Sequence, residues 1–136
     1  MEVTAIELIE RLEREHSEVR EALASAGPLA ESRAWEGFRA ALAACAAVLG
    51  EGLDEHSKAE DAILFPLISE MLGHDLVDVF TAEHVQIRAL RDVVYGQEAD
   101  AQRVRAFIEL GELLGSHMDR EDGALFPAAR GVLRGS

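Results

Sequence analysis

Cysteine, basic residues and long apolar runs are all scarce in this sequence, and each scarcity excludes a class of protein. The 136 residues include a single cysteine, Cys45, which excludes an internal disulfide and a cysteine-rich zinc site. Only 13 lysine and arginine residues stand against 26 acidic ones, and the net charge of −13 argues against a nucleic-acid partner. No apolar run is long enough to span a bilayer. We therefore expect a soluble, cytoplasmic protein that binds neither nucleic acid nor a membrane.

Aromatic residues, at 5%, and prolines, of which there are three, are also few. Alanine, leucine, glutamate and arginine dominate instead, and these residues favour helices. The apolar fraction of 49% is enough for the core of one domain. The composition therefore predicts an all-α domain over residues 1–130, followed by a flexible C-terminal tail over residues 131–136. Cys45 stands in an apolar run and is expected to be a buried core residue.

Apolar residues recur at alternating spacings of three and four, which is the pattern of helices that pack side by side. The pattern predicts four helices, over residues of about 4–25, 32–73, 75–96 and 100–130. The loops between them are short, and short loops make neighbouring helices antiparallel. We therefore expect an up-down-up-down antiparallel four-helix bundle.

Capping residues and prolines predict where these helices begin and end. Thr4 and Glu7 have the spacing of a capping box at the first helix start. The sequence "AGP" at 26–28 is expected to end that helix. Pro66 is expected to kink or end the second helix, because proline lacks a backbone donor. Asp75 is a candidate N-cap for the third helix.

An eleven-residue motif, H-x-x-x-E-D-x-x-L-F-P, occurs twice in the chain. It reads "HSKAEDAILFP" at 56–66 and "HMDREDGALFP" at 117–127. The segments that begin at residues 15 and 83 share a second pattern, E-H-x-x-x-R. The order of these motifs predicts two related helical hairpins that pack about a pseudo-two-fold axis.

Each predicted helix carries one histidine at a core-facing position, and two of these histidines are followed by a glutamate at i+4. The six residues are His16, His56, Glu60, His84, His117 and Glu121. An isolated H-x-x-x-E is usually a surface pair, and an isolated core histidine usually bonds to a carbonyl or water. Recurrence at core-facing positions in all four helices favours a metal site, because buried carboxylates are costly unless they are paired or bind a cation.

The number and type of these side chains bear on which metal they would bind. Six ligands exceed the four of a structural zinc site. Four imidazole nitrogens and two bridging carboxylates suit a dinuclear iron centre, although ligand type alone leaves manganese or a mixed site open.

Three further residues lie near these histidines in the sequence, and a fifth histidine, His74, lies apart from them. Glu15 and Glu83 each precede a candidate ligand and could fix an imidazole tautomer by accepting its hydrogen bond, or be solvated at the surface. Arg88 could pair with such a carboxylate or extend to the surface. His74 falls in a predicted loop and is expected to be exposed and outside the site.

The six candidate ligands in this order, with the doubled Leu-Phe-Pro, resemble the hemerythrin-like HHE cation-binding domain over residues of about 4–130. The resemblance implies a four-helix bundle that holds two non-haem iron ions with an oxo or hydroxo bridge, and it ranks manganese and zinc below iron. Oxygen-carrying hemerythrins usually have a fifth histidine where this chain has Arg88. The set of four histidines and two glutamates is more similar to the domain of iron-centre repair proteins and of the F-box iron sensor.

The function expected from these features is binding of, or reaction with, a small ligand: O2, NO or H2O2. Apolar residues near the site would wall the ligand pocket, and these are Leu12, Val19, Leu49, Ile87, Leu114 and Met118. The alternatives are iron or oxygen sensing, iron storage or repair without turnover, and a metal-free helical interaction module. The sequence leaves open whether the protein is an enzyme, whether it has a redox partner and which oligomer it forms.

Overall fold

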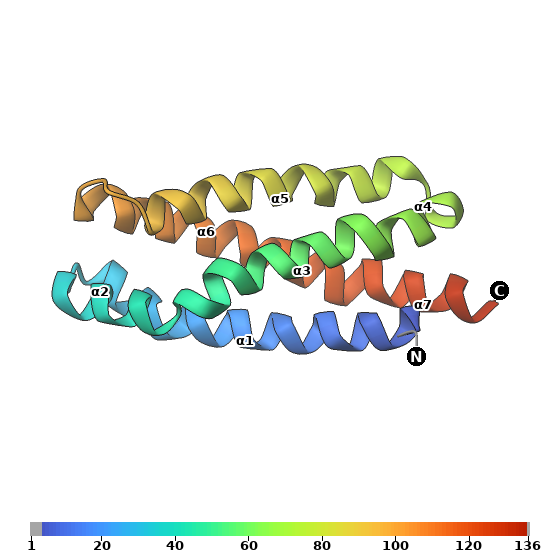
Figure 1. The fold of residues 1–136 in the computed structure, drawn as a ribbon, viewed down its shortest axis with the longest axis horizontal. Helices are drawn as coiled ribbons and strands as arrows, with labels where there is room; N and C mark the ends of the chain where they lie inside the picture. The colour runs from blue at the N-terminus through green and yellow to red at the C-terminus, as the bar shows by residue number, and fades with distance from the viewer. Residues whose placement is uncertain (1–3, 136) are drawn as a thin grey trace.

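The computed structural model describes residues 4–135, and all regular structure within that range is helical. The helical runs cover residues 5–31, 35–72, 74–94 and 100–135, with Cys45 as a single turn residue inside the second run. They lie lengthwise in an elongated molecule, with both chain termini at one end (Figure 1). The predicted all-α class is therefore confirmed.

Both α-helices and π-helical turns make up these runs. In chain order they are α1 (Ala5–Glu31), α2 (Trp35–Ala44), η1 (Val48–Gly52), α3 (Leu53–Ala59), η2 (Glu60–Leu64), α4 (Phe65–Leu72), α5 (His74–Val94), α6 (Asp100–Arg120), η3 (Glu121–Leu125) and α7 (Phe126–Gly135). The segments η1, η2 and η3 are π-helical turns, in which hydrogen bonds join residues five apart instead of four. Such turns are frequent at functional sites. Among residues 4–135, no helix has the length and apolar character that crossing a bilayer requires.

The helix that begins the chain starts where the sequence predicts but continues further. Thr4 is its N-cap, and its Oγ1 accepts a hydrogen bond of 3.1 Å from the backbone N–H of Glu7. The predicted end at 26–28 is wrong, because α1 continues through Pro28 to Glu31. The proline removes only one donor near the helix end, and the last turns bury alanine side chains in the core.

The start of α5 also differs from the prediction. Gly73 caps both helices with a φ of +100°, a conformation that favours glycine. Asp75 is therefore not the N-cap and lies in the first turn of α5. His74 is exposed, as expected, but it is the first residue of α5 rather than part of a loop.

Neither Pro66 nor Pro127 ends its helical run, so of the two outcomes expected for Pro66, a kink or an end, the end is wrong. Just before Pro66, the N–H of Phe65 donates across the wide turn η2 to the carbonyl of Glu60. The turn η3 repeats this arrangement before Pro127. Since the preceding turn is a π-turn, the missing proline donor falls at the start of a new α-helical segment, where it is tolerated.

The C-terminal helix runs past the predicted end at residue 130. Residues 131–135, expected to belong to a flexible tail, form the last part of α7. Val132 and Leu133 pack against buried apolar residues of the bundle. The limits of the domain itself stay a prediction.

Two apolar clusters fill the interior, one toward each end of the molecule. One cluster holds the edge-to-face pair Phe38 and Phe107, with ring centroids 5.5 Å apart, and includes the buried Cys45. The other includes Phe65 and Phe126. Along α1, α3 and α5 a buried histidine separates the residues of one cluster from those of the other. The buried histidine of α6, His117, follows Leu114 of the first cluster and precedes Leu125 of the second. A layer of polar side chains therefore divides the core.

We expect Gly73→Ala to lower the free energy of unfolding by about 1–3 kcal/mol, because alanine is strained at a positive φ. Urea denaturation of the two proteins in the same metal state measures this change. Gly111→Ala is the matched control: it lies inside α6, and an added Cβ would meet nothing within 4 Å. That variant should gain about 0.5–1 kcal/mol. A Gly73→Ala protein as stable as the wild type would contradict the assigned turn.

Candidate metal centre

The six side chains predicted from the sequence meet in the polar layer between the two apolar clusters. Each of the six residues is at most 6% exposed. Their nitrogen and oxygen atoms form two groups, and within each group the atoms lie within 4.8 Å of one another. The groups are His16, His56, Glu60 and Glu121, and Glu60, His84, His117 and Glu121. The two glutamates are therefore shared, while each pair of histidines belongs to one group.

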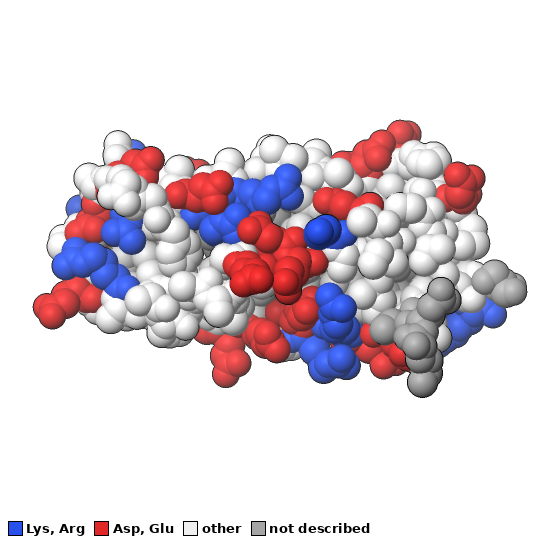
Figure 2. Space-filling model, viewed as in Figure 1, with Lys and Arg blue, Asp and Glu red and all other residues white. Residues whose placement is uncertain are grey.

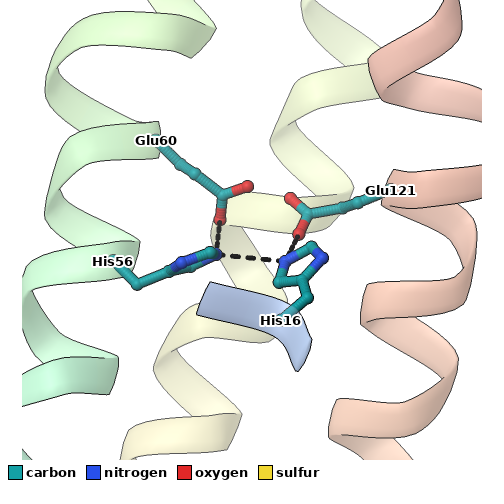
Figure 3. A group of neighbouring side chains, drawn as sticks. All are labelled: His16, His56, Glu60 and Glu121. Atoms are coloured by element: carbon teal, nitrogen blue, oxygen red, sulfur yellow. Dashed lines mark hydrogen bonds and ion pairs between the residues drawn. The ribbon is translucent and has the colours of Figure 1, made fainter. Parts of the chain in front are cut away.

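The first group brings four elements to one point, and its side chains converge in Figure 3. His16 on α1 and His56 on α3 approach through their Nε2 atoms at 3.1 Å. Glu121 Oε1, at the start of η3, lies 3.0 Å from Nε2 of His16. Glu60 Oε1, at the start of η2, lies 3.5 Å from Nε2 of His56.

The second group repeats this arrangement with the remaining histidines. The rings of His84 on α5 and His117 on α6 have centroids 4.9 Å apart. Nε2 of His84 lies 3.0 Å from Glu60 Oε1, and Nε2 of His117 lies 3.4 Å from Glu121 Oε1. Each glutamate therefore has histidine nitrogens of both groups around one carboxylate oxygen.

Every histidine of the centre is held from outside by a carboxylate on another helix. The Nδ1 contacts are His16 with Asp122 at 2.8 Å, His56 with Glu15 at 2.9 Å, His84 with Asp61 at 3.0 Å, and His117 with Glu83 at 2.8 Å. A carboxylate accepts, so Nδ1 carries the proton and donates it. The inward Nε2 atoms are then left as lone pairs that face one another and two carboxylates.

The charge of the outer carboxylates supports this tautomer. The hydrogen bond from His56 lowers the pKa of Glu15, which outweighs the effect of its partial burial. Burial tends to raise the pKa of Glu83, but hydrogen bonds from His117 and Arg120 bring it below its ordinary value. Both groups are therefore ionised acceptors at neutral pH.

Sequence reasoning anticipated contacts for Glu15 and Glu83 but missed Asp61 and Asp122. Both aspartates were visible in the doubled motif, where each directly follows a candidate glutamate ligand. In each motif the glutamate turns inward, and the aspartate reaches a histidine on another helix. Because that contact is tertiary, helical spacing within one segment does not predict it.

A third layer surrounds the four outer carboxylates. The pairs are Arg11 with Glu15 at 3.3 Å, Arg20 with Asp122 at 2.8 Å, Arg120 with Glu83 at 2.7 Å, and Thr81 with Asp61 at 3.1 Å. Three of the four carboxylates therefore have a cationic partner, and the fourth has a hydroxyl.

Arg88 takes the second of the two places considered for it, at the surface. Within residues 4–135 it forms no hydrogen bond or ion pair with a carboxylate of the site. It lines an open hollow on the surface together with Lys58, Asp61 and Arg91. Acidic and basic side chains gather side by side in the middle of this face, over α3 and α5 (Figure 2).

Several buried polar atoms of the centre have no hydrogen-bond partner among the described residues. They are Glu60 Oε2, His117 Nε2 and both carboxylate oxygens of Glu121. His16 Nε2 is 3.0 Å from Glu121 Oε1, but this close approach lacks hydrogen-bonding geometry. Unpaired buried acceptors are costly, and a cation among them would remove that cost. The donor set, rich in imidazole and carboxylate, therefore fits a metal.

Without a metal, protons supply the positive charge that this cluster lacks. Burial and the neighbouring charge of Glu121 hold the pKa of Glu60 well above its ordinary value. Burial opposes protonation of His117, but the adjoining carboxylates of Glu121 and Glu60 raise its pKa to about 9. Burial likewise opposes ionisation of Glu121, yet contacts with Glu60, His117 and His16 lower its pKa well below the ordinary value. Metal binding would displace such protons.

The comparison with family models decides what kind of domain this is. The model of the hemerythrin HHE cation binding domain matches residues 7–129. The chain belongs to this family. Searches of curated proteins and of solved structures found no match. The resemblance inferred from the sequence is confirmed, and family membership makes this hemerythrin HHE domain a cation-binding domain.

A small cavity adjoins the four histidines of the hemerythrin HHE domain. Its volume is about 10 Å³, and its other lining residues are Val19, Leu53, Ser57, Ile87, Leu114 and Met118. Four of the six apolar residues expected to wall a ligand pocket therefore line it. Leu12 and Leu49 do not line it; each is fully buried in one of the two apolar clusters.

We expect Asp122→Asn to weaken metal binding by about 10- to 100-fold, because the amide holds His16 less firmly and in either tautomer. Competition with a chromophoric metal chelator measures the affinity. Asp119→Asn is the matched control: Asp119 also pairs with Arg20, at 3.1 Å, but its side chain is 76% exposed. Equal affinities in the two variants would contradict a role for the outer carboxylates.

Proposed function

We propose that this hemerythrin HHE domain is an up-down-up-down antiparallel four-helix bundle that holds two iron ions and binds or reacts with O2, NO or H2O2. The observation that carries the proposal is the sharing of two buried carboxylates by two pairs of histidines. One ion would lie between His16 and His56, and the other between His84 and His117. Glu60 and Glu121 would each reach both ions.

The pseudo-symmetry of the contacts supports this assignment. Glu15 accepts a hydrogen bond from His56 in the first half of the chain, as Glu83 does from His117 in the second. The connections between the helical runs are short, and short connections favour antiparallel neighbours. The repeated motif also supports the up-down-up-down order, because it divides the chain into two related hairpins.

The residues of the chain would prepare the centre for its ions. When bound, iron would supply redox chemistry and a coordination position for a small ligand. The histidines present lone pairs whose direction is fixed by the outer carboxylates. The apolar clusters on both sides limit access of bulk water.

The size of the cavity supports a diatomic molecule or peroxide as the ligand. A volume of about 10 Å³ is close to the minimum that holds one water molecule. Its walls other than the histidines are apolar, apart from Ser57. An organic substrate would need a much larger opening.

Iron-dependent sensing is a second candidate, and the unpaired acceptors of Glu60 and Glu121 favour it. They would make the stability of the bundle depend on its metal, so that iron supply would be reported by folding. Turnover is not needed for such a role.

We expect His56→Ala and Glu121→Ala each to bind fewer metal ions than the wild type, from about two per chain to one or none. Their melting temperatures in the presence of iron should fall, because less binding free energy stabilises the folded state. Elemental analysis and thermal unfolding measure both effects. His74→Ala is the control, since His74 is exposed and its nearest charged partner, Glu70, is 3.9 Å away. Unchanged metal content in both site variants would contradict the assignment of His56 and Glu121 as ligands.

The visible spectrum of the iron-loaded protein separates the two candidate functions. After reduction with dithionite, addition of O2, NO or H2O2 should produce a new absorption band if the cavity admits a small ligand. A spectrum that none of the three changes, combined with a large loss of thermal stability on chelation, would favour sensing instead.

A further inference from the structure

The two sides of the centre differ in how closely they are packed. On one side, phenylalanine rings cover the histidines: Phe65 stacks on His84 at 5.9 Å, and Phe126 on His16 at 5.6 Å. Phe80 meets His117 edge-on at 5.3 Å. The cavity lies among residues that include Leu114 and members of the opposite apolar cluster. Next to the histidines, a small ligand therefore has room on the side of this opposite cluster and not on the side of the phenylalanine rings.

Ser57 is the one hydroxyl-bearing residue in the lining of this cavity. It follows His56 on α3 and is one helical turn from Leu53, which also lines the cavity. Ser57 is 4% exposed, and its hydroxyl forms no hydrogen bond with another residue in the described part of the chain. Its oxygen is not among the fully enclosed unpaired atoms, so this donor adjoins accessible space.

The other buried serine of this helical run shows what an ordinary hydroxyl does. Ser69, at 5% exposure, donates a hydrogen bond of 3.4 Å to the carbonyl of Pro66. A buried hydroxyl without such a partner is destabilising unless a ligand or water supplies one. A serine hydroxyl can rotate to donate toward whatever occupies the adjoining space.

We infer that Ser57 donates a hydrogen bond to the small ligand in this cavity and so determines which ligand is retained. This inference rests on the proposed function. Hydrogen bonds to acceptors that carry negative charge are roughly twice as strong as those between neutral groups. Ser57 therefore favours ligands that gain negative charge in the complex, such as O2 and peroxide. The apolar walls, among them Ile87 and Met118, offer no comparable donor.

The NO complex of the iron-loaded protein provides the test, with stopped-flow dissociation and vibrational spectroscopy as the two measurements. Ser57→Ala should release NO about three- to tenfold faster, the loss expected for one hydrogen bond. The N–O stretching frequency of the wild-type complex should shift in D2O, and the shift should vanish in Ser57→Ala. Ser57→Thr keeps the hydroxyl and should restore both properties.

Ser69→Ala is the matched control, and it should behave as the wild type because Ser69 bonds to the backbone away from the cavity. Iron content measured in every variant shows that the centre itself is unchanged. A Ser57→Ala protein with wild-type iron content, NO dissociation and D2O shift would overturn the role of Ser57 alone. An iron-loaded wild type that binds no NO, O2 or peroxide would overturn the proposed function, and the role of Ser57 with it.

Discussion

The fold is organised around acceptor atoms that face one another in a buried core. The Nε2 atoms of His16 and His56 are 3.1 Å apart, and the carboxylates of Glu60 and Glu121 adjoin them. Neutral imidazoles and carboxylates in this arrangement repel unless a cation or extra protons lie among them. The outer carboxylates increase this repulsion, because they hold the protons on the Nδ1 atoms and leave the inward nitrogens as lone pairs that can bind metal. The polar layer is thus costly for the apoprotein and suited to a bound cation.

The repeated motif combines several tasks in one short stretch. Its histidine and glutamate turn inward, its aspartate orients a histidine of the other half, and its phenylalanine ring stacks on that same histidine. The backbone carbonyl of Glu60 accepts the N–H of Phe65 across the π-turn, which lets the helix continue into Pro66. Since Asp61 and Phe65 of one half contact His84 of the other, neither half is complete by itself. The duplication therefore yields one shared centre instead of two separate sites.

The sequence predicted the helical class and identified the six central side chains as candidate ligands, because core-facing positions repeat with the period of the helix. It did not predict the contact of Asp61 with His84, which depends on how two helices pack. Nor did it predict that α1 passes Pro28 and that a π-turn precedes Pro66. Local propensity treats each proline as a helix end, whereas burial of the surrounding residues and one wide turn outweigh the loss of a single donor. The unpaired hydroxyl of Ser57 emerged only once neighbouring helices were in place.

The central claim is that the shared carboxylates of Glu60 and Glu121 hold two metal ions side by side. X-ray absorption spectroscopy of the iron-loaded protein tests this claim most directly, because it reports both the ligand atoms and any neighbouring metal. The account predicts nitrogen and oxygen ligands only, and an iron–iron separation of about 3–4 Å. A single iron per chain without a neighbouring metal, or sulfur among the ligands, would contradict it.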